Sequence, residues 1–105
     1  MHEKQAADGL AALGNITRLK LFRLLVQAGA DGLNMGEMQR LLGIPGSTLN
    51  HHSGVLCRAG LVQPAKRGRE VVCTANYTAI QQLSGFLLDN CCGGIAADGD
   101  SEHAA

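Results

Sequence analysis

Two helix-start signals lie close together in the middle of this 105-residue chain. Asn34 followed by Glu37 has the spacing of a capping box, in which two side chains satisfy free backbone N–H groups at a helix start. Gly43 can take the left-handed conformation that ends that helix, and Pro45 suits the first turn of the next. The sequence therefore predicts a short helix, a tight turn and a second helix over residues 46–58, which is the spacing of a helix-turn-helix.

Apolar residues recur at helical spacing in three other segments, residues 3–13, 15–29 and 77–92. The side chains predicted to be buried are Ala6, Leu10, Leu13, Leu19, Phe22, Leu25, Val26, Met38, Leu41, Leu42, Leu49, Leu56, Ile80, Leu83, Leu87 and Cys91. With no Trp, one Tyr and two Phe, the core must consist mainly of aliphatic residues, and a chain this short has a thin core. An oligomer interface is a natural source of further burial, so we expect a dimer.

Between the last two helices, the sequence predicts two short strands around Arg67, Gly68 and Arg69, with the glycine where a hairpin turn needs it. Pro64 has no N–H to donate, so the first strand should lie at an edge. The predicted fold class is mainly α with a small β-hairpin. We expect residues 1–92 to form one domain and residues 93–105, which lack apolar bulk, to form a flexible acidic tail.

Charge and polarity point to an anionic partner. The net charge is zero, but the middle of the chain is basic and the C-terminal end is acidic. The second helix of the helix-turn-helix carries short polar side chains at its start, where such a helix reaches base edges or phosphates. The candidate DNA-binding residues are Ser47, Thr48, Asn50, His51 and His52 on that helix and Arg67 and Arg69 on the hairpin. The alternative is a plain polar helix face beside a solvated turn.

The blocks "ALGNITRLKLFRLL", "MQRLLGIPGSTLNHHSGVLCRAGLV" and "KRGREVVCTAN", which begin at residues 12, 38 and 66, resemble the ArsR/SmtB family of bacterial metalloregulatory repressors. The resemblance implies a winged helix-turn-helix that forms a homodimer through its first and last helices. It also implies binding to a palindromic double-stranded operator and release when an inducer binds. Ser53 departs from the pattern, because a leucine usually packs there, and Gly54 should soften the helix.

The cysteines are the candidate inducer ligands. The family's Cys-x-Cys arsenic motif is absent from the stretch "NMGEMQRLL", and residues 77–92 contain no histidine. Cys91 and Cys92 resemble the adjacent pair at the end of the last helix in another arsenic-sensing branch, whose third cysteine is missing here. Cys73 is a candidate third ligand, reached from the partner chain across the dimer, because a helix from Tyr77 to Cys91 spans about 20 Å. Thiolates suit thiophilic ions. We therefore expect trivalent arsenic, as arsenite or an organoarsenical, as inducer, and no permanently bound cofactor.

Two alternatives stay open for the thiols. They could form a redox or persulfide switch, in which Cys73 pairs with Cys91 or Cys92. Cys91 and Cys73 could instead be small buried hydrophobic residues. We expect no enzymatic activity, because no cysteine has a histidine base and an orienting acid in suitable positions. The short apolar runs and the polar N-terminus predict a cytoplasmic protein without a membrane partner.

Overall fold

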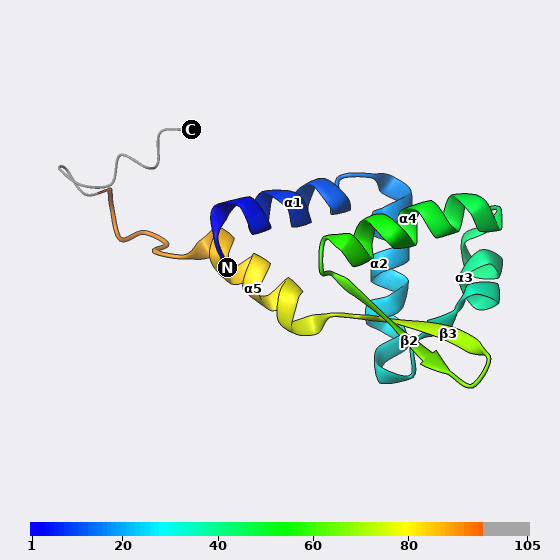
Figure 1. The fold of residues 1–105 in the computed structure, drawn as a ribbon. Helices are drawn as coiled ribbons and strands as arrows, with labels where there is room; N and C mark the ends of the chain where they lie inside the picture. Colours follow the sequence, from blue (N-terminus) through cyan, green and yellow to red (C-terminus); the bar gives the residue numbers. More distant parts are fainter. Residues whose placement is uncertain (96–105) are drawn as a thin grey trace.

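The helix-turn-helix predicted from the capping signals forms the centre of the fold. The computed structural model describes residues 1–95 (Figure 1). Its elements, in chain order, are α1 (Glu3–Leu13), α2 (Ile16–Ala28), the short 3-10 helix η1 (Gly29–Asp31), β1 (Leu33–Asn34), α3 (Met35–Leu42), α4 (Gly46–Arg58), β2 (Val62–Arg67), β3 (Glu70–Ala75) and α5 (Tyr77–Leu88). Helices α1 and α5 lie side by side at one end, and α2, α3, α4 and the sheet make up the rest.

The predicted capping box of α3 is confirmed. The Asn34 Oδ1 atom accepts from the Glu37 backbone N–H at 2.8 Å, and the Glu37 Oε1 atom accepts from the Asn34 backbone N–H at 2.9 Å. Gly43 ends the helix with a φ of 66°, in the left-handed region where glycine has no Cβ penalty. Pro45 stands one position earlier than predicted, as the N-cap of α4, and α4 has the predicted bounds.

The hairpin is confirmed, and the sheet has a third strand that was not predicted. Strands β2 and β3 pair antiparallel from Val62 opposite Ala75 to Arg67 opposite Glu70. The two residues of β1 pair with the other side of β3, which gives the strand order β1-β3-β2. Strand β2, which contains Pro64, therefore lies at an edge as expected.

Gly32 holds the root of the hairpin close to η1. Its φ is 64°, and a Cβ atom at this position would collide with the backbone carbonyl oxygen of Cys73. Glycine is therefore required both by the backbone conformation and by the lack of space.

The core confirms part of the predicted pattern. Leu21, Leu25, Met38, Leu49, Leu56, Leu61 and Cys73 are its fully buried large side chains within the described residues. The predicted burial of Leu10, Leu19, Val26, Leu41 and Leu87 is wrong for the single chain, since these side chains are between 40% and 58% exposed. In α2 the buried face consists of Leu21, Phe22 and Leu25, because that side meets α1, α4 and β3.

The last helix is shorter than predicted. Helix α5 ends at Leu88 rather than Cys92, and Asn90 and Cys92 have left-handed φ values of 61° and 62°. Cys91 is therefore outside the helix and exposed, so its predicted place on the buried stripe is wrong. Residues 96–105 of the predicted acidic tail lie outside the described residues. Within residues 1–95, no helix has the length and apolar character to cross a membrane.

Candidate nucleic-acid interface and thiol positions

The first half of α4 presents a polar face to solvent. Ser47, Thr48, Asn50 and His51 are exposed, while Leu49 between them is fully buried and fixes the rotation of the helix. The start of α4 and the tip of the hairpin lie at the same end of the molecule, away from α1 and α5 (Figure 1). This is the arrangement in which a helix can enter a groove while the hairpin meets the flanking backbone.

His52 takes a different position from the other predicted DNA-binding residues of α4. It is half-buried, and its Nδ1 atom lies 3.3 Å from the Nη1 atom of Arg18 on α2. Burial lowers the pKa of His52, and the positive charges of Arg18 and then His51 lower it further. The ring is thus held neutral near pH 7, with Nδ1 placed to accept from Arg18. The structure places His52 between two helices rather than on the exposed face.

The two predicted hairpin arginines also differ. The guanidinium of Arg67 donates to the backbone carbonyl oxygens of Asp31 at 3.2 Å and Ala30 at 3.3 Å, which ties the end of β2 to η1. Arg69 is exposed at the turn, and within residues 1–95 its side chain makes no protein hydrogen bond. Arg69 is therefore better placed than Arg67 to meet a phosphate.

The predicted thiol ligands form two separate groups in one chain. Cys91 and Cys92 are exposed, and their Sγ atoms lie 3.3 Å apart. Cys73 is 2% exposed in the central strand β3, which precedes the start of α5. Within the described residues, no cluster of three or more histidine, cysteine or acidic side chains could hold a metal ion. One chain therefore brings together Cys91 and Cys92 but not Cys73.

A polar contact that the sequence analysis missed lies beneath α4. The Ser53 hydroxyl is 3.9 Å from the Sγ atom of Cys73 and is itself almost fully buried. Burial raises the pKa of Cys73 and of Cys57, and hydrogen bonding with Ser53 opposes that rise at both thiols. The available signal was the serine at a position where a leucine was expected, four residues before Cys57.

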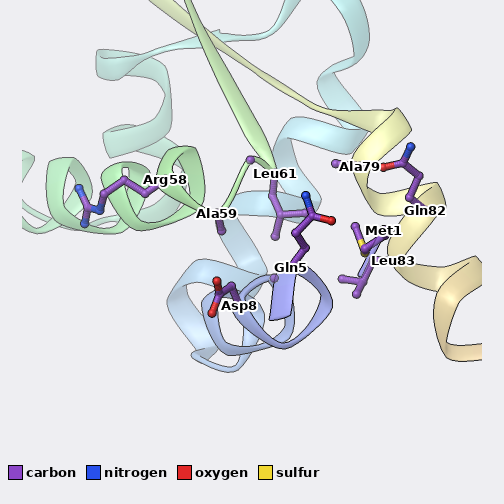
Figure 2. A pocket seen from close by; sticks show the side chains of 11 residues that line it. Met1, Gln5, Asp8, Arg58, Ala59, Leu61, Ala79, Gln82 and Leu83 are labelled. Carbon is purple, nitrogen blue, oxygen red and sulfur yellow. The ribbon is translucent and has the colours of Figure 1, made fainter. Parts of the chain in front are cut away.

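A cavity of about 360 Å³ lies where α1, α5 and the turn after α4 meet (Figure 2). Gln5, Leu61, Gln82 and Leu83 point toward this space, while the guanidinium of Arg58 extends away from it along α4. The cavity contains no cysteine or histidine, so it is distinct from the thiol positions.

Comparison with known proteins agrees with this architecture. A family model described as a helix-turn-helix domain matches residues 13–64. An ArsR-like transcriptional regulator from Rhodococcus sp. RHA1 superimposes with a TM-score of 0.72 at 24% identity, covering 80% of this chain and 76% of that one. Reduced HlyU from Vibrio cholerae N16961 gives a TM-score of 0.65 at 27% identity, with coverage of 85% and 90%.

A third neighbour is the homodimeric winged helix-turn-helix DNA-binding domain of Mb0332 from Mycobacterium bovis, a possible ArsR-family transcriptional regulator. It gives a TM-score of 0.67 at 20% identity and covers 85% of this chain and 82% of that one. No curated protein matches the sequence. This chain has the winged helix-turn-helix fold of ArsR-like regulators. The family model identifies a helix-turn-helix domain, and the structural matches show that the rest of the chain completes a winged helix-turn-helix.

In an ArsR-type protein of this topology, α4 is the recognition helix and the β2–β3 hairpin is the wing. The family model ends at residue 64, so it covers the recognition helix but neither β3 nor α5. Three of the four cysteines therefore lie beyond the matched segment, namely Cys73, Cys91 and Cys92. The comparisons therefore bear on the helix-turn-helix and the wing, and they leave the role of Cys73, Cys91 and Cys92 open.

Proposed function

We propose that this chain is a homodimeric transcriptional repressor that leaves its operator when a trivalent arsenical binds Cys91 and Cys92. The observation that carries the inducer part is the exposed sulfur pair, with Sγ atoms 3.3 Å apart at the end of α5. Two thiols so close together can bind one soft atom without rearrangement of the fold. The repressor part rests on the recognition helix and the wing.

DNA binding is supported by the exposed face of α4 and by the basic wing. Asn50 suits adenine, and the hydroxyls of Ser47 and Thr48 suit phosphate or bases near the start of a recognition helix. Arg69 and Lys66 on the wing are exposed and can displace counterions from the duplex backbone. The start of α4 supplies the base readout, and the wing supplies position and affinity.

Dimerisation is supported by apolar side chains that the single chain leaves exposed on its first and last helices. Leu10 on α1 is 43% exposed, and Leu87 and Leu88 on α5 are 58% and 69% exposed. A chain with a thin core gains stability when such side chains are covered by a second copy. The homodimeric state of the Mb0332 domain supports a homodimer here.

Cys91 and Cys92 favour a trivalent arsenical that already carries one organic group. Binding forms two As–S bonds, and the two thiol protons leave with two hydroxyl groups of the arsenical as water. An organic group then fills the third position of the arsenic atom. Inorganic arsenite would need a third thiol. Cys73 of a partner chain could supply it only if β3 opened, because that side chain is 2% exposed.

The position of the pair offers a route to release. Helix α5 is separated from β3 of the wing by one residue and ends at Leu88, three residues before Cys91, so a ligand on the thiols acts next to the proposed dimer interface. The ligand shifts the protein toward one state only by its difference in affinity between the two states. A dimer with altered helix orientation no longer matches the half-site spacing of its operator.

The experiment is a titration of reduced protein on a fluorescent duplex selected from a random library, with DNA binding followed by anisotropy. Phenylarsine oxide, a monosubstituted trivalent arsenical, should release wild-type protein at one equivalent per chain. Cys91→Ser and Cys92→Ser should bind the duplex and resist release, while the matched control Cys57→Ser should respond like wild type. A full response in both serine variants would refute the inducer site. Failure to select any duplex would refute the DNA-binding part.

A thiol-redox or persulfide-sensing repressor is the second candidate, favoured by the same 3.3 Å sulfur contact. Oxidation of Cys91 and Cys92 to a disulfide, or uptake of sulfane sulfur, would change the same end of α5. Release by a peroxide or persulfide, together with no release by the arsenical, would favour this candidate.

A further inference from the structure

Ser53 lies beside Cys73 on the buried side of α4, the helix that also carries Cys57. Its hydroxyl lies 3.9 Å from the Sγ atom of Cys73 on β3. Cys57 stands four residues after Ser53 on α4, so the two side chains share one face of the helix. Cys57 packs against the buried cluster that contains Cys73, so both thiols lie on the same side of α4 near the Ser53 hydroxyl.

The surroundings of this pair separate it from Cys91 and Cys92. Cys73 belongs to the core cluster, and Cys57 packs against that cluster while remaining partly accessible. A small oxidant can therefore reach Cys57 from solvent, whereas Cys73 is reached only through Cys57 or by local opening. Cys91 and Cys92 follow the C-terminal end of α5, whereas Cys73 lies on β3, before the start of that helix.

We propose that Cys57 and Cys73 form an internal redox pair that closes into a disulfide between α4 and β3 when the chain meets a hydroperoxide. This assigns Cys73 a partner within its own chain, in place of Cys91 or Cys92.

The chemistry balances in two steps. The Cys57 thiolate attacks one oxygen of hydrogen peroxide, forming a sulfenic acid and releasing hydroxide, which takes up the thiol proton as water. The Cys73 thiolate then attacks the sulfenic sulfur, the S–O bond breaks and a second water leaves. Two thiols are oxidised by two electrons, and one peroxide is reduced to two waters.

The reaction should be slow and should accelerate with pH. Burial raises the pKa of both thiols, so the thiolate fraction at pH 7 is small. As the pH rises toward those pKa values the thiolate fraction increases, and the rate of disulfide formation should rise with it.

Closure of the bond should disturb DNA reading. A disulfide requires an S–S distance of about 2.05 Å, whereas the Cys73 sulfur now lies 3.9 Å from the Ser53 hydroxyl and makes no disulfide. The bond draws the C-terminal half of α4 toward β3 and tilts the exposed face that starts at Ser47. This consequence rests on the proposed DNA binding, and we expect duplex affinity to fall by roughly fivefold or more.

The test uses the full chain with Cys91→Ser and Cys92→Ser, which leaves Cys57 and Cys73 as its two thiols. After treatment with hydrogen peroxide and alkylation of remaining thiols, mass spectrometry of the intact chain should show the loss of two hydrogen atoms. Peptide mapping should then find Cys57 joined to Cys73. In the otherwise wild-type chain the same linked peptide should form. A Cys73–Cys91 or Cys73–Cys92 peptide in its place, or two alkylated thiols after prolonged oxidation, would overturn the proposal.

Two further variants show whether loss of the disulfide is a specific effect or a consequence of misfolding. Cys57→Ser changes a half-buried side chain and should retain the circular dichroism of the parent while losing the disulfide. Ser53→Ala removes the shared hydroxyl and leaves both thiols in place, so it should alter the rate of closure but not the identity of the bond. Because peptide mapping needs no DNA, an intact disulfide with unchanged duplex affinity overturns the DNA consequence alone.

Discussion

Arg18 joins three helices through its guanidinium group. Its Nε atom donates to the backbone carbonyl oxygen of Ala12 at 2.6 Å, near the end of α1, and its Nη1 atom lies 3.3 Å from Nδ1 of His52 on α4. The carbonyl belongs to the last turn of α1, where no intrahelical donor is available. Arg18 thus links the helix of the proposed dimer interface to the recognition helix.

Replacement of Arg18 by alanine should lower the free energy of unfolding by about 1–3 kcal/mol, because it removes charge-assisted hydrogen bonds at a half-buried position. Urea denaturation followed by circular dichroism measures this change. Lys20→Ala, at an exposed position of the same helix, is the matched control and should change stability by less than about 0.5 kcal/mol. Equal effects of the two variants would contradict the bridging role.

His52 should make stability depend on pH in the acidic range. Its pKa in the folded chain is lowered below the ordinary value of 6.5. The unfolded chain then binds more protons at pH values around and below 6.5, so the free energy of unfolding should fall as the pH is lowered from 7.5 toward the folded pKa. His52→Gln should flatten this dependence. His51→Gln, on the exposed face, should leave most of this pH dependence in place. If His52→Gln showed the wild-type dependence of unfolding free energy on pH, His52 would not be its source.

The two wing arginines should separate affinity from stability. Arg69→Ala should weaken binding to all duplexes and reduce the salt dependence of log K by about one unit of slope, because one phosphate contact is lost. Its thermal unfolding should be unchanged. Arg67→Ala should lower stability, because the bonds to the carbonyl oxygens of Asp31 and Ala30 are lost. Anisotropy titrations at several salt concentrations and thermal melts measure the two effects.

A charged substitution on α5 tests whether this helix forms the dimer interface. Leu87→Glu should shift the chain from dimer to monomer, because a carboxylate would be buried without a partner at the proposed interface. Leu41→Glu on α3 is matched in exposure, 57% against 58% for Leu87, and should leave the dimer intact. Sedimentation equilibrium measures both. A dimer that survives Leu87→Glu would place the interface elsewhere.

Local chemistry explains which parts of the fold could be predicted from the sequence. The capping box of Asn34 and Glu37 and the left-handed Gly43 depend on residues within one or two turns, so the helix bounds near them were predicted correctly. The two residues of β1 were missed because their strand character comes from pairing with Cys73 and Val72, which are distant in the sequence. Apolar spacing alone also could not show which leucines face a second chain.

In the candidate site, too, features set by local sequence could be predicted and features set by packing between elements could not. The exposed face of α4 follows from helical periodicity around Leu49, and its DNA contacts stay a prediction. The neighbours of His52, Arg67 and Cys73 depend on how α2, η1 and α4 pack, which no local pattern specifies. The place of Cys91 depended on where α5 stops. The left-handed residues after Leu88 carried no signal beyond an asparagine, and asparagine tolerates that conformation better than most residues.

The collision that any side chain at Gly32 would cause also governs the reach of the wing. A methyl group there would push β3 away from the loop between η1 and β1, and we expect the tip of the β2–β3 hairpin to shift as a result. The position of Arg69 at the hairpin tip thus depends on a glycine that packs against β3 away from that tip. An exchange at that hinge point should impair operator recognition without touching a single group that faces nucleic acid.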